Sequence, residues 1–209
     1  MKKSRERKEL PLFCIIGPNG AGKTEILNLL LLSNCRDILL YIPRYASRPR
    51  RPDEKNSQEY KFVTPEEFEE LKRKGFFIPG TIREDKVDGV VYYKGVPKKK
   101  YWPRARKKTR FRLALFGTTS SYFLKAQMPE MRLVYIKNEN RINRLRVVKR
   151  FSSSADAIDN RLTQYRNIAK HRRLYVWCAC DYTVSNEEEG GQLKCAEEIL
   201  KYILTTCKL

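Results

Sequence analysis

The sequence predicts one α/β domain built on a mostly parallel sheet with helices on both faces. Three observations support this. The chain has 209 residues, enough for one compact core but not for a second large domain. Short apolar runs alternate with helix-like segments along the chain, as they do in parallel sheets. The first apolar run ends in a glycine-rich turn, so we expect a ligand beyond the carboxyl ends of the strands.

The first elements are read from apolar spacing. Residues 11–16 are apolar and rich in β-branched side chains, which predicts a strand, and 24–33 has helical spacing. Residues 38–42 predict a second strand. The following stretch, 44–57, is rich in proline and arginine, and we expect an irregular connection outside the regular core.

The next helix carries its own start signal. Thr64 can cap a helix, Pro65 suits its first turn, and Glu67 can reach back to complete a capping box. The helix is expected to end near Gly75.

The second half repeats the alternation of strands and helices. Residues 111–116 and 133–136 are strand-like, and each precedes a helical segment. Residues 139–173 look helical and arginine-rich, 174–180 predicts a late strand, and 196–203 predicts a closing helix.

Charge points to anionic partners. Lys and Arg number 44 against 24 acids, a net charge of +20. The tract 94–112 holds ten basic residues and no acid, interleaved with Tyr101, Trp102 and Phe111. It is typical either of a solvated basic loop or, less commonly, of a nucleic-acid-binding or nuclear-import segment. Nucleic acid is therefore a possible but not the favoured partner.

Composition also excludes several classes of protein. No apolar run is long enough to span a bilayer, and residues 1–10 lack the apolar core of a secretory signal. We expect a cytoplasmic monomer with no membrane partner, the basic tract leaving the nucleus possible. The six cysteines are expected to be reduced thiols. His171 is the only histidine, which speaks against a tetrahedral metal site and against a histidine base.

The glycine-rich turn carries the strongest motif. Residues 17–24 fit G-x-x-x-x-G-K-[ST], placed after a strand and at the start of a helix. Glycines allow the backbone N–H groups to approach phosphates, Lys23 brings a charge to the β and γ oxygens, and Thr24 can bind Mg²⁺. We therefore predict ATP and Mg²⁺ as cofactors. The predicted nucleotide-binding residues are Gly17, Asn19, Gly20, Ala21, Gly22, Lys23 and Thr24.

Downstream motifs resemble the guanylate kinase family of P-loop nucleoside monophosphate kinases. R-x-x-R-x-x-E begins at Arg48 and includes Arg51, and Y-x-F begins at Tyr60, just before the capped helix. The resemblance implies that Arg48, Arg51 and Tyr60 hold the acceptor phosphate, with Arg44 and Tyr92 at neighbouring substrate positions.

Two later motifs extend the resemblance. Arg146, Arg150 and Arg161 are similar to the arginines that close over the transferring phosphates, and with Lys23 they are the implied catalytic residues. The segment 181–186 is similar to D-Y-x-V-x-N after the last strand, which implies that Asn186 approaches the adenine.

The resemblance also implies how the chain is divided. We expect a core parallel sheet flanked by helices, a small monophosphate-binding arm and a helical lid. The expected parts are a basic tail at 1–9 and a domain at 10–209, with core 10–43 and 109–209, arm about 44–108 and lid about 140–165.

The chain departs from the family where guanine is read. Pro79 stands at the acidic position that follows the family's G-x-F, and residues 110–117 hold no carboxylate where the family has L-D-I-D-x-x-G. The family's serine ahead of the arm is matched by Arg44. The resemblance implies ATP-dependent phosphorylation of a nucleoside monophosphate, with GMP or dGMP favoured. The alternatives are a weakly catalytic module that binds phosphorylated or acidic peptides, and a kinase for another phosphorylated acceptor, such as a sugar phosphate or a nucleic-acid end.

Overall fold

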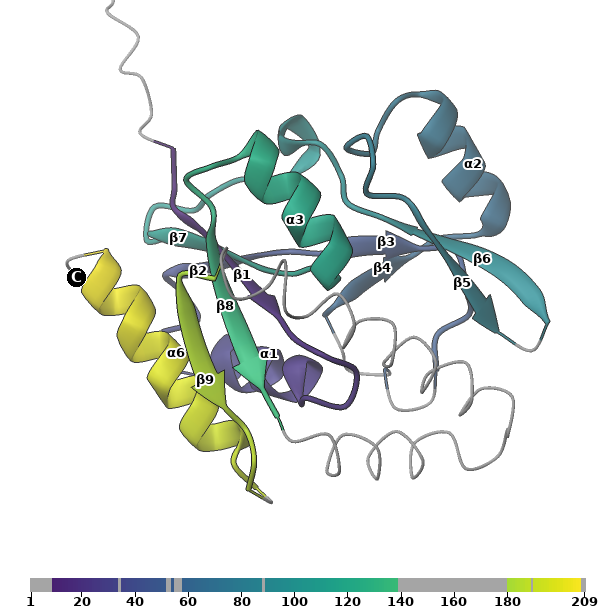
Figure 1. Cartoon of the computed structure of the whole chain (residues 1–209). Helices are drawn as coiled ribbons and strands as arrows, with labels where there is room; N and C mark the ends of the chain where they lie inside the picture. Colours follow the sequence, from purple (N-terminus) through teal and green to yellow (C-terminus); the bar gives the residue numbers. More distant parts are fainter. Residues whose placement is uncertain are drawn as a thin grey trace, which may run out of the picture.

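The computed structural model describes residues 9–207 except 34, 52–53, 55–57, 88, 139–179 and 189. Its main sheet has five parallel strands in the order β2-β7-β1-β8-β9 (Figure 1). These strands are β1 (Leu12–Ile16), β2 (Leu39–Ile42), β7 (Phe111–Leu115), β8 (Arg132–Lys137) and β9 (Tyr182–Ser185).

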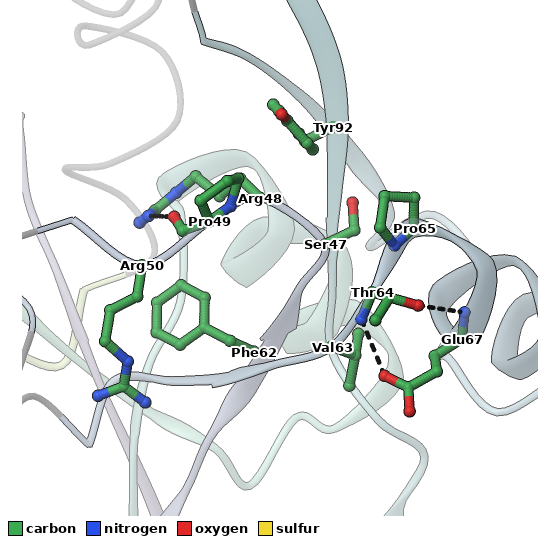
Figure 2. A pocket seen from close by; sticks show the side chains of 10 residues that line it. All are labelled: Ser47, Arg48, Pro49, Arg50, Phe62, Val63, Thr64, Pro65, Glu67 and Tyr92. Carbon is green, nitrogen blue, oxygen red and sulfur yellow. Dashed lines mark hydrogen bonds between the residues drawn. The ribbon is translucent and has the colours of Figure 1, made fainter.

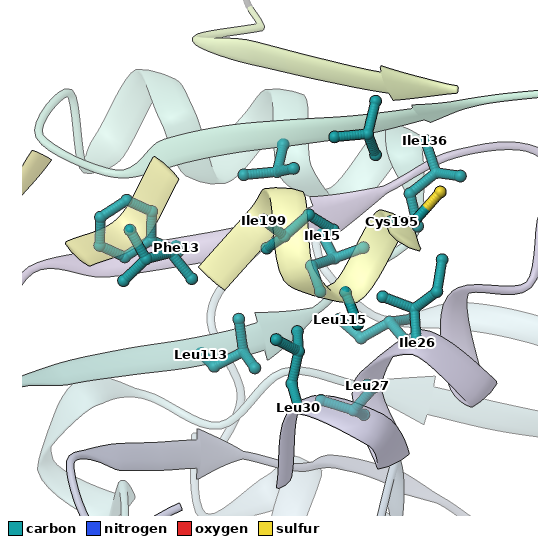
Figure 3. Packing of buried hydrophobic residues seen from close by; sticks show 14 of the residues in the cluster. Phe13, Ile15, Ile26, Leu27, Leu30, Leu113, Leu115, Ile136, Cys195 and Ile199 are labelled. Atoms are coloured by element: carbon teal, nitrogen blue, oxygen red, sulfur yellow. The ribbon is translucent and has the colours of Figure 1, made fainter. Parts of the chain in front are cut away.

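Helices cover both faces of this sheet, as the sequence predicts. Helix α1 (Lys23–Leu32) and helix α6 (Gln192–Thr206) pack on one face, and α3 (Thr118–Gln127) lies on the other (Figure 1). Residues of β1, β7, β8, α1 and α6 form the largest buried cluster, with Phe13, Ile15, Ile26, Leu113 and Ile199 fully buried (Figure 3). The predicted α/β architecture is confirmed.

A second, smaller sheet stands beside the first, in the order β4-β3-β6-β5. Its strands come from the segment between β2 and β7, and its face is covered by α2 (Pro65–Arg73), whose Phe68 packs on Phe77. A one-turn 3-10 helix, η2 (Lys99–Tyr101), follows it. The strands are β3 (Arg44–Ala46), β4 (Tyr60–Phe62), β5 (Arg83–Val87) and β6 (Val90–Gly95).

The expectation of an irregular connection at 44–57 was wrong at its start. Residues 44–46 form β3, which pairs in parallel with β4 and antiparallel with β6. Both pairings join residues distant in sequence, so local composition could not indicate them.

The strand at residues 182–185 was not predicted from the sequence. β9 is Tyr182–Ser185, so the D-Y-x-V-x-N segment forms the strand itself and does not follow it. Residues 174–179, most of the predicted strand, and residues 139–173 lie outside the described residues. The closing helix was found, although α6 extends further at both ends than the predicted 196–203.

The predicted capping box of α2 is confirmed. Thr64 accepts from the Glu67 backbone N–H at 3.2 Å, and the Glu67 carboxylate accepts from the Thr64 N–H at 2.8 Å.

The cysteines that the structure describes, Cys14, Cys35, Cys180, Cys195 and Cys207, are free thiols. No helix in the part of the chain that the structure describes combines the length and apolarity needed to cross a membrane.

Candidate functional site

The glycine-rich loop joins the carboxyl end of β1 to the start of α1. Gly22 is the residue before α1 and has φ 82°, a left-handed conformation that glycine adopts without strain. A Cβ at Gly22 would lie 2.7 Å from Nδ2 of Asn186. Glycine is therefore required here both for conformation and for close packing.

The functional side chains of this loop lie at the first turn of α1. Lys23 Nζ donates to the Pro18 carbonyl at 2.7 Å, which folds the lysine back over the loop. Thr24 Oγ1 donates to Glu59 Oε2 at 2.5 Å. Because the first N–H groups of a helix have no partner within that helix, this end of α1 favours anionic phosphate groups.

Asn186 supports the loop from β9. Its side chain is fully buried, and Nδ2 donates to the Ala21 carbonyl at 2.9 Å. Its Oδ1 has no hydrogen-bond partner among the described residues. The structure therefore places Asn186 directly behind the phosphate loop, while its implied contact with adenine stays a prediction.

The arginine-rich arm contains a buried ion cluster around Arg48. Arg48 is 2% exposed and donates to both carboxylate oxygens of Glu54, at 2.7 and 2.6 Å, and to Asp85 at 3.1 Å. Lys94 also pairs with Asp85, at 2.6 Å. Burial raises the pKa of Glu54, but the Arg48 hydrogen bond and charge outweigh it and leave this pKa below its ordinary value. A buried guanidinium needs such partners to offset its lost hydration.

Glu54 also contacts Arg51, the second arginine of the motif. Arg51 Nη1 lies 3.7 Å from Glu54 Oε1, and the Arg51 backbone N–H donates to the same carboxylate at 3.1 Å. The Arg51 side chain is more exposed than that of Arg48, at 21% against 1%. Of the two, Arg51 thus presents the more accessible charge.

Tyr60 lies at the centre of several cations. The guanidinium carbons of Arg44 and Arg48 lie 4.4 and 5.4 Å from its ring centroid, and Lys94 Nζ lies at 5.6 Å. Burial raises the pKa of Tyr60, and the Arg44 charge offsets this only in part, so the phenol stays protonated. The predicted residues Arg44, Arg48 and Tyr60 are therefore brought together around one aromatic ring.

Beside this cluster the arm is hollowed by a pocket of about 430 Å³ (Figure 2). Tyr92 of β6 lines it, as do Arg48 and Phe62, and the Arg50 guanidinium lies 4.7 Å from the Phe62 ring centroid. The capped end of α2 forms its far side, with the Thr64–Glu67 hydrogen bonds drawn in the figure.

Glu59 links the arm to the phosphate loop, and sequence reasoning missed it. Its carboxylate forms an ion pair with Arg44 and accepts from the Thr24 hydroxyl. Burial raises the pKa of Glu59, but the Arg44 charge, the Thr24 hydroxyl and the Lys23 charge outweigh it, so the pKa lies below its ordinary value. The residue is an ionised, buried acid.

Sequence reasoning considered Asp85, with Glu84, only as an acid that could restore guanine reading, and it missed that Asp85 pairs with Arg48 and Lys94. A local signal existed only for Glu59, an acid directly before the Y-x-F motif. Asp85 and Lys94 come from adjacent strands, and their meeting with Arg48 depends on the pairing of β5 with β6.

The positions expected to read guanine carry different chemistry. Pro79 is exposed, and the buried Thr81 hydroxyl donates to the Ile78 carbonyl at 2.7 Å within the same turn. Strand β7 has the sequence FRLAL and offers no carboxylate. Asp85 is held by Arg48 and Lys94.

Two of the three aromatic residues of the basic tract are buried inside the fold, whereas Tyr101 is 39% exposed. Phe111 is fully buried in β7, and Trp102 is 8% exposed, with its Nε1 donating to the Pro97 carbonyl at 2.7 Å. The Tyr101 ring stacks on Phe76 at 4.3 Å. Phe111 and Trp102 are therefore not available to stack on bases, and the nucleic-acid interpretation of the tract stays a prediction.

The remaining predicted residues, Arg146, Arg150 and Arg161, lie outside the described residues. Within the described ranges, no group of three or more histidine, cysteine or acidic side chains could hold a metal by itself. A Mg²⁺ ion that arrives with nucleotide phosphates needs only one or two protein oxygens, and Thr24 fits that requirement.

Comparison with known proteins gives a consistent result. The family model named Guanylate kinase matches residues 10–93. A guanylate kinase of Novosphingobium aromaticivorans is 31% identical over 193 residues, which cover 90% of this chain and 80% of the relative. One from Francisella tularensis subsp. holarctica is 28% identical over 203 residues, covering 91% and 94%. The crystal structure of guanylate kinase from Anaplasma phagocytophilum superposes with a TM-score of 0.60 at 19% identity, over 95% of this chain and 87% of that one.

Proposed function

Since this chain belongs to the guanylate kinase family, we propose that it transfers the γ-phosphoryl group of ATP to a nucleoside monophosphate, with GMP or dGMP as the favoured acceptor. The observation that carries the proposal is the junction of two anion sites. Thr24 of the phosphate loop and Arg44 of the arm contact the same carboxylate, that of Glu59. A donor site and an acceptor site therefore adjoin through a single side chain.

The donor half works by electrostatics. The N–H groups at the start of α1 and the Lys23 ammonium bind the β and γ phosphates, and the ammonium leaves the Pro18 carbonyl to do so. Mg²⁺, when bound, neutralises charge on these phosphates, and Thr24 would hold it.

The acceptor half binds a phosphate dianion. Planar guanidinium groups grip phosphate through paired N–H donors, and Arg51, Arg48 and Tyr60 supply donors at one place. Glu54 and Asp85 fix the position of Arg48. Holding both phosphates in line is enough for phosphoryl transfer, so no covalent nucleophile on the protein is needed. Arg146, Arg150 and Arg161 would add charge stabilisation over the transferring group, by resemblance to the family.

The complete phosphate loop argues against a purely peptide-binding module. Such a module has no use for a lysine and a threonine placed at the first turn of α1. The test is to incubate the protein with ATP and Mg²⁺ and each common nucleoside monophosphate, and to measure ADP. ADP production that requires GMP or dGMP supports the proposal, whereas binding of acidic peptides without ADP production with any monophosphate overturns it.

A further inference from the structure

The arm contributes one acidic side chain to the phosphate loop. Glu59 lies one residue before β4, is 7% exposed, and uses its two carboxylate oxygens differently. Oε2 accepts from the Thr24 hydroxyl at 2.5 Å, and Oε1 pairs with Arg44.

The backbone of Glu59 is fixed as well as its side chain. Its carbonyl accepts from the Tyr41 hydroxyl at 3.2 Å and from the Arg44 N–H at 3.2 Å. Tyr41 belongs to β2 of the main sheet, so Glu59 is anchored to the same body as the phosphate loop. Its carboxylate position beside Thr24 is preorganised.

A carboxylate beside Thr24 can serve as the acid that a phosphate loop uses, together with its Ser or Thr, to hold Mg²⁺. Proteins with this motif hold Mg²⁺ with the loop Ser or Thr together with an acid that commonly follows a neighbouring strand. β7 and β8 are the two strands that flank β1, and neither residues 111–117 (FRLALFG) nor residues 132–138 (RLVYIKN) carry an acid. Glu59 presents an oxygen at Thr24 from another part of the chain.

We infer that Glu59, with Thr24, holds the Mg²⁺ that accompanies ATP, and that Arg44 orients the Glu59 carboxylate. This inference rests on the proposed function. Mg²⁺ prefers hard oxygen ligands and is usually bound by one or two carboxylates or hydroxyls plus substrate phosphates. The Thr24 hydroxyl and Glu59 Oε2 are two such oxygens in contact, and Arg44 supplies the hydrogen bond that orients a metal-binding carboxylate.

The test compares ATP affinity with and without the metal. Isothermal titration calorimetry gives the Kd for ATP in EDTA and in Mg²⁺, and their ratio is the Mg²⁺ advantage. In Glu59→Gln this advantage should fall about tenfold or more, the range seen when the ligands of a metal are disturbed. The affinity in EDTA should stay equal or rise, because a negative charge beside the ATP phosphates is removed.

This pattern separates a metal-holding role from a structural one. If Glu59 only joined the arm to the loop, Glu59→Gln would weaken ATP binding equally in EDTA and in Mg²⁺, and the inference would be overturned. Asp181→Asn is the matched control, because Asp181 is also a carboxylate paired with an arginine but belongs to neither proposed phosphate site, and its Mg²⁺ advantage should equal that of the unmodified protein.

A second variant, Glu59→Asp, provides the test if Glu59→Gln does not fold. Glu59→Asp keeps the charge beside Arg44 but withdraws the oxygen from Thr24 by one methylene. The Mg²⁺ advantage should again fall, while the affinity for ATP measured in EDTA stays the same. An unchanged Mg²⁺ advantage contradicts the inference. If the unmodified protein binds no ATP under either condition, the proposed function fails, and the inference that rests on it falls with it. ATP binding with a Mg²⁺ advantage that the Glu59 variants retain overturns the inference alone.

Discussion

At the scale of single residues, buried acids determine what the arginines can do. The resemblance implied that Arg48 and Arg51 contact phosphate in the same way, but the structure distinguishes them. Arg48 is enclosed by Glu54 and Asp85, because a guanidinium that loses its water must be paired. Arg51 keeps more exposure. The sequence shows the arginines and their spacing, but only the structure shows which of them is buried and therefore contributes to the stability of the fold.

Alanine substitution should separate the two arginines. Arg51→Ala should weaken GMP binding by about 1.5–3 kcal/mol, the range for a charge-assisted hydrogen bond, with little change in melting temperature or ATP affinity. Arg48→Ala should weaken GMP binding too, and should also destabilise the fold by about 3 kcal/mol, since it strips a partner from two buried acids. Calorimetry and urea unfolding measure these effects. Equal stability of the two variants would show that the ion cluster has no structural role.

Lys23 offers the sharpest test of the donor site. Lys23→Ala should lower turnover about 10²–10³-fold, as removal of one preorganised charge does elsewhere, and should weaken ATP binding. Its ammonium contacts a loop carbonyl outside the hydrophobic core, so the far-ultraviolet circular dichroism spectrum should stay the same. A folded variant with normal ATP affinity would remove Lys23 from the phosphate site.

At the scale of elements, locally coded features were predicted and long-range pairings were not. The α2 start was predicted in full because Thr64, Pro65 and Glu67 act within one turn. β3 was missed because its partners lie far along the chain. β9 was missed for the same reason, since only its pairing with β8 identifies it.

The acid of the D-Y-x-V-x-N segment has a structural task in this account. Asp181 accepts from the Leu133 N–H at 2.8 Å, from Arg132 at 2.8 Å and from Lys125 at 3.1 Å, joining β8 to the start of β9. Burial raises the pKa of Asp181, but these donors outweigh it and leave the pKa below the ordinary 3.8. The stability it contributes is therefore present above pH 3.8 and is lost as pH falls through the lower folded value.

Asp181→Asn should test this join. The variant should be less stable by about 1–3 kcal/mol near neutral pH, and the difference from the unmodified protein should shrink below pH 3.8. Urea unfolding at several pH values measures it. Asp37→Asn is the control, because the Asp37 pair with Lys108 is exposed and should contribute at most about 1 kcal/mol. A pH-independent difference between Asp181→Asn and the unmodified protein would contradict this account.

At the scale of the whole molecule, the sequence predicts the architecture and the donor site better than the acceptor's selectivity. The phosphate loop is contiguous, so its placement after β1 follows from sequence alone. The proposed acceptor site assembles from β3, β4, β5 and β6, and sequence could not show that Asp85 pairs with Arg48 and Lys94 there. Selectivity depends on this assembly, in which Pro79 and β7 supply no carboxylate for guanine.

Selectivity among bases should therefore be modest. A pocket that pairs the N–H groups of guanine with buried carboxylates rejects a base that leaves them unpaired, and such a pocket discriminates by about 10⁴–10⁵. With those carboxylates replaced, GMP should be preferred over AMP by much less, about 10²-fold, in competition binding. A preference of several orders of magnitude that is lost in Glu84→Gln would show that this exposed acid restores guanine reading.

If one phosphoryl group moves from ATP to GMP on this protein, the two nucleotide products must appear together. The most direct measurement is chromatography of the nucleotides after incubation with ATP, Mg²⁺ and GMP. ADP and GDP should form in equal amounts, and the rate at which both form should fall about 10²–10³-fold in Lys23→Ala. ADP that accumulates without GDP would show hydrolysis instead of transfer, and the absence of both products would contradict the proposed function.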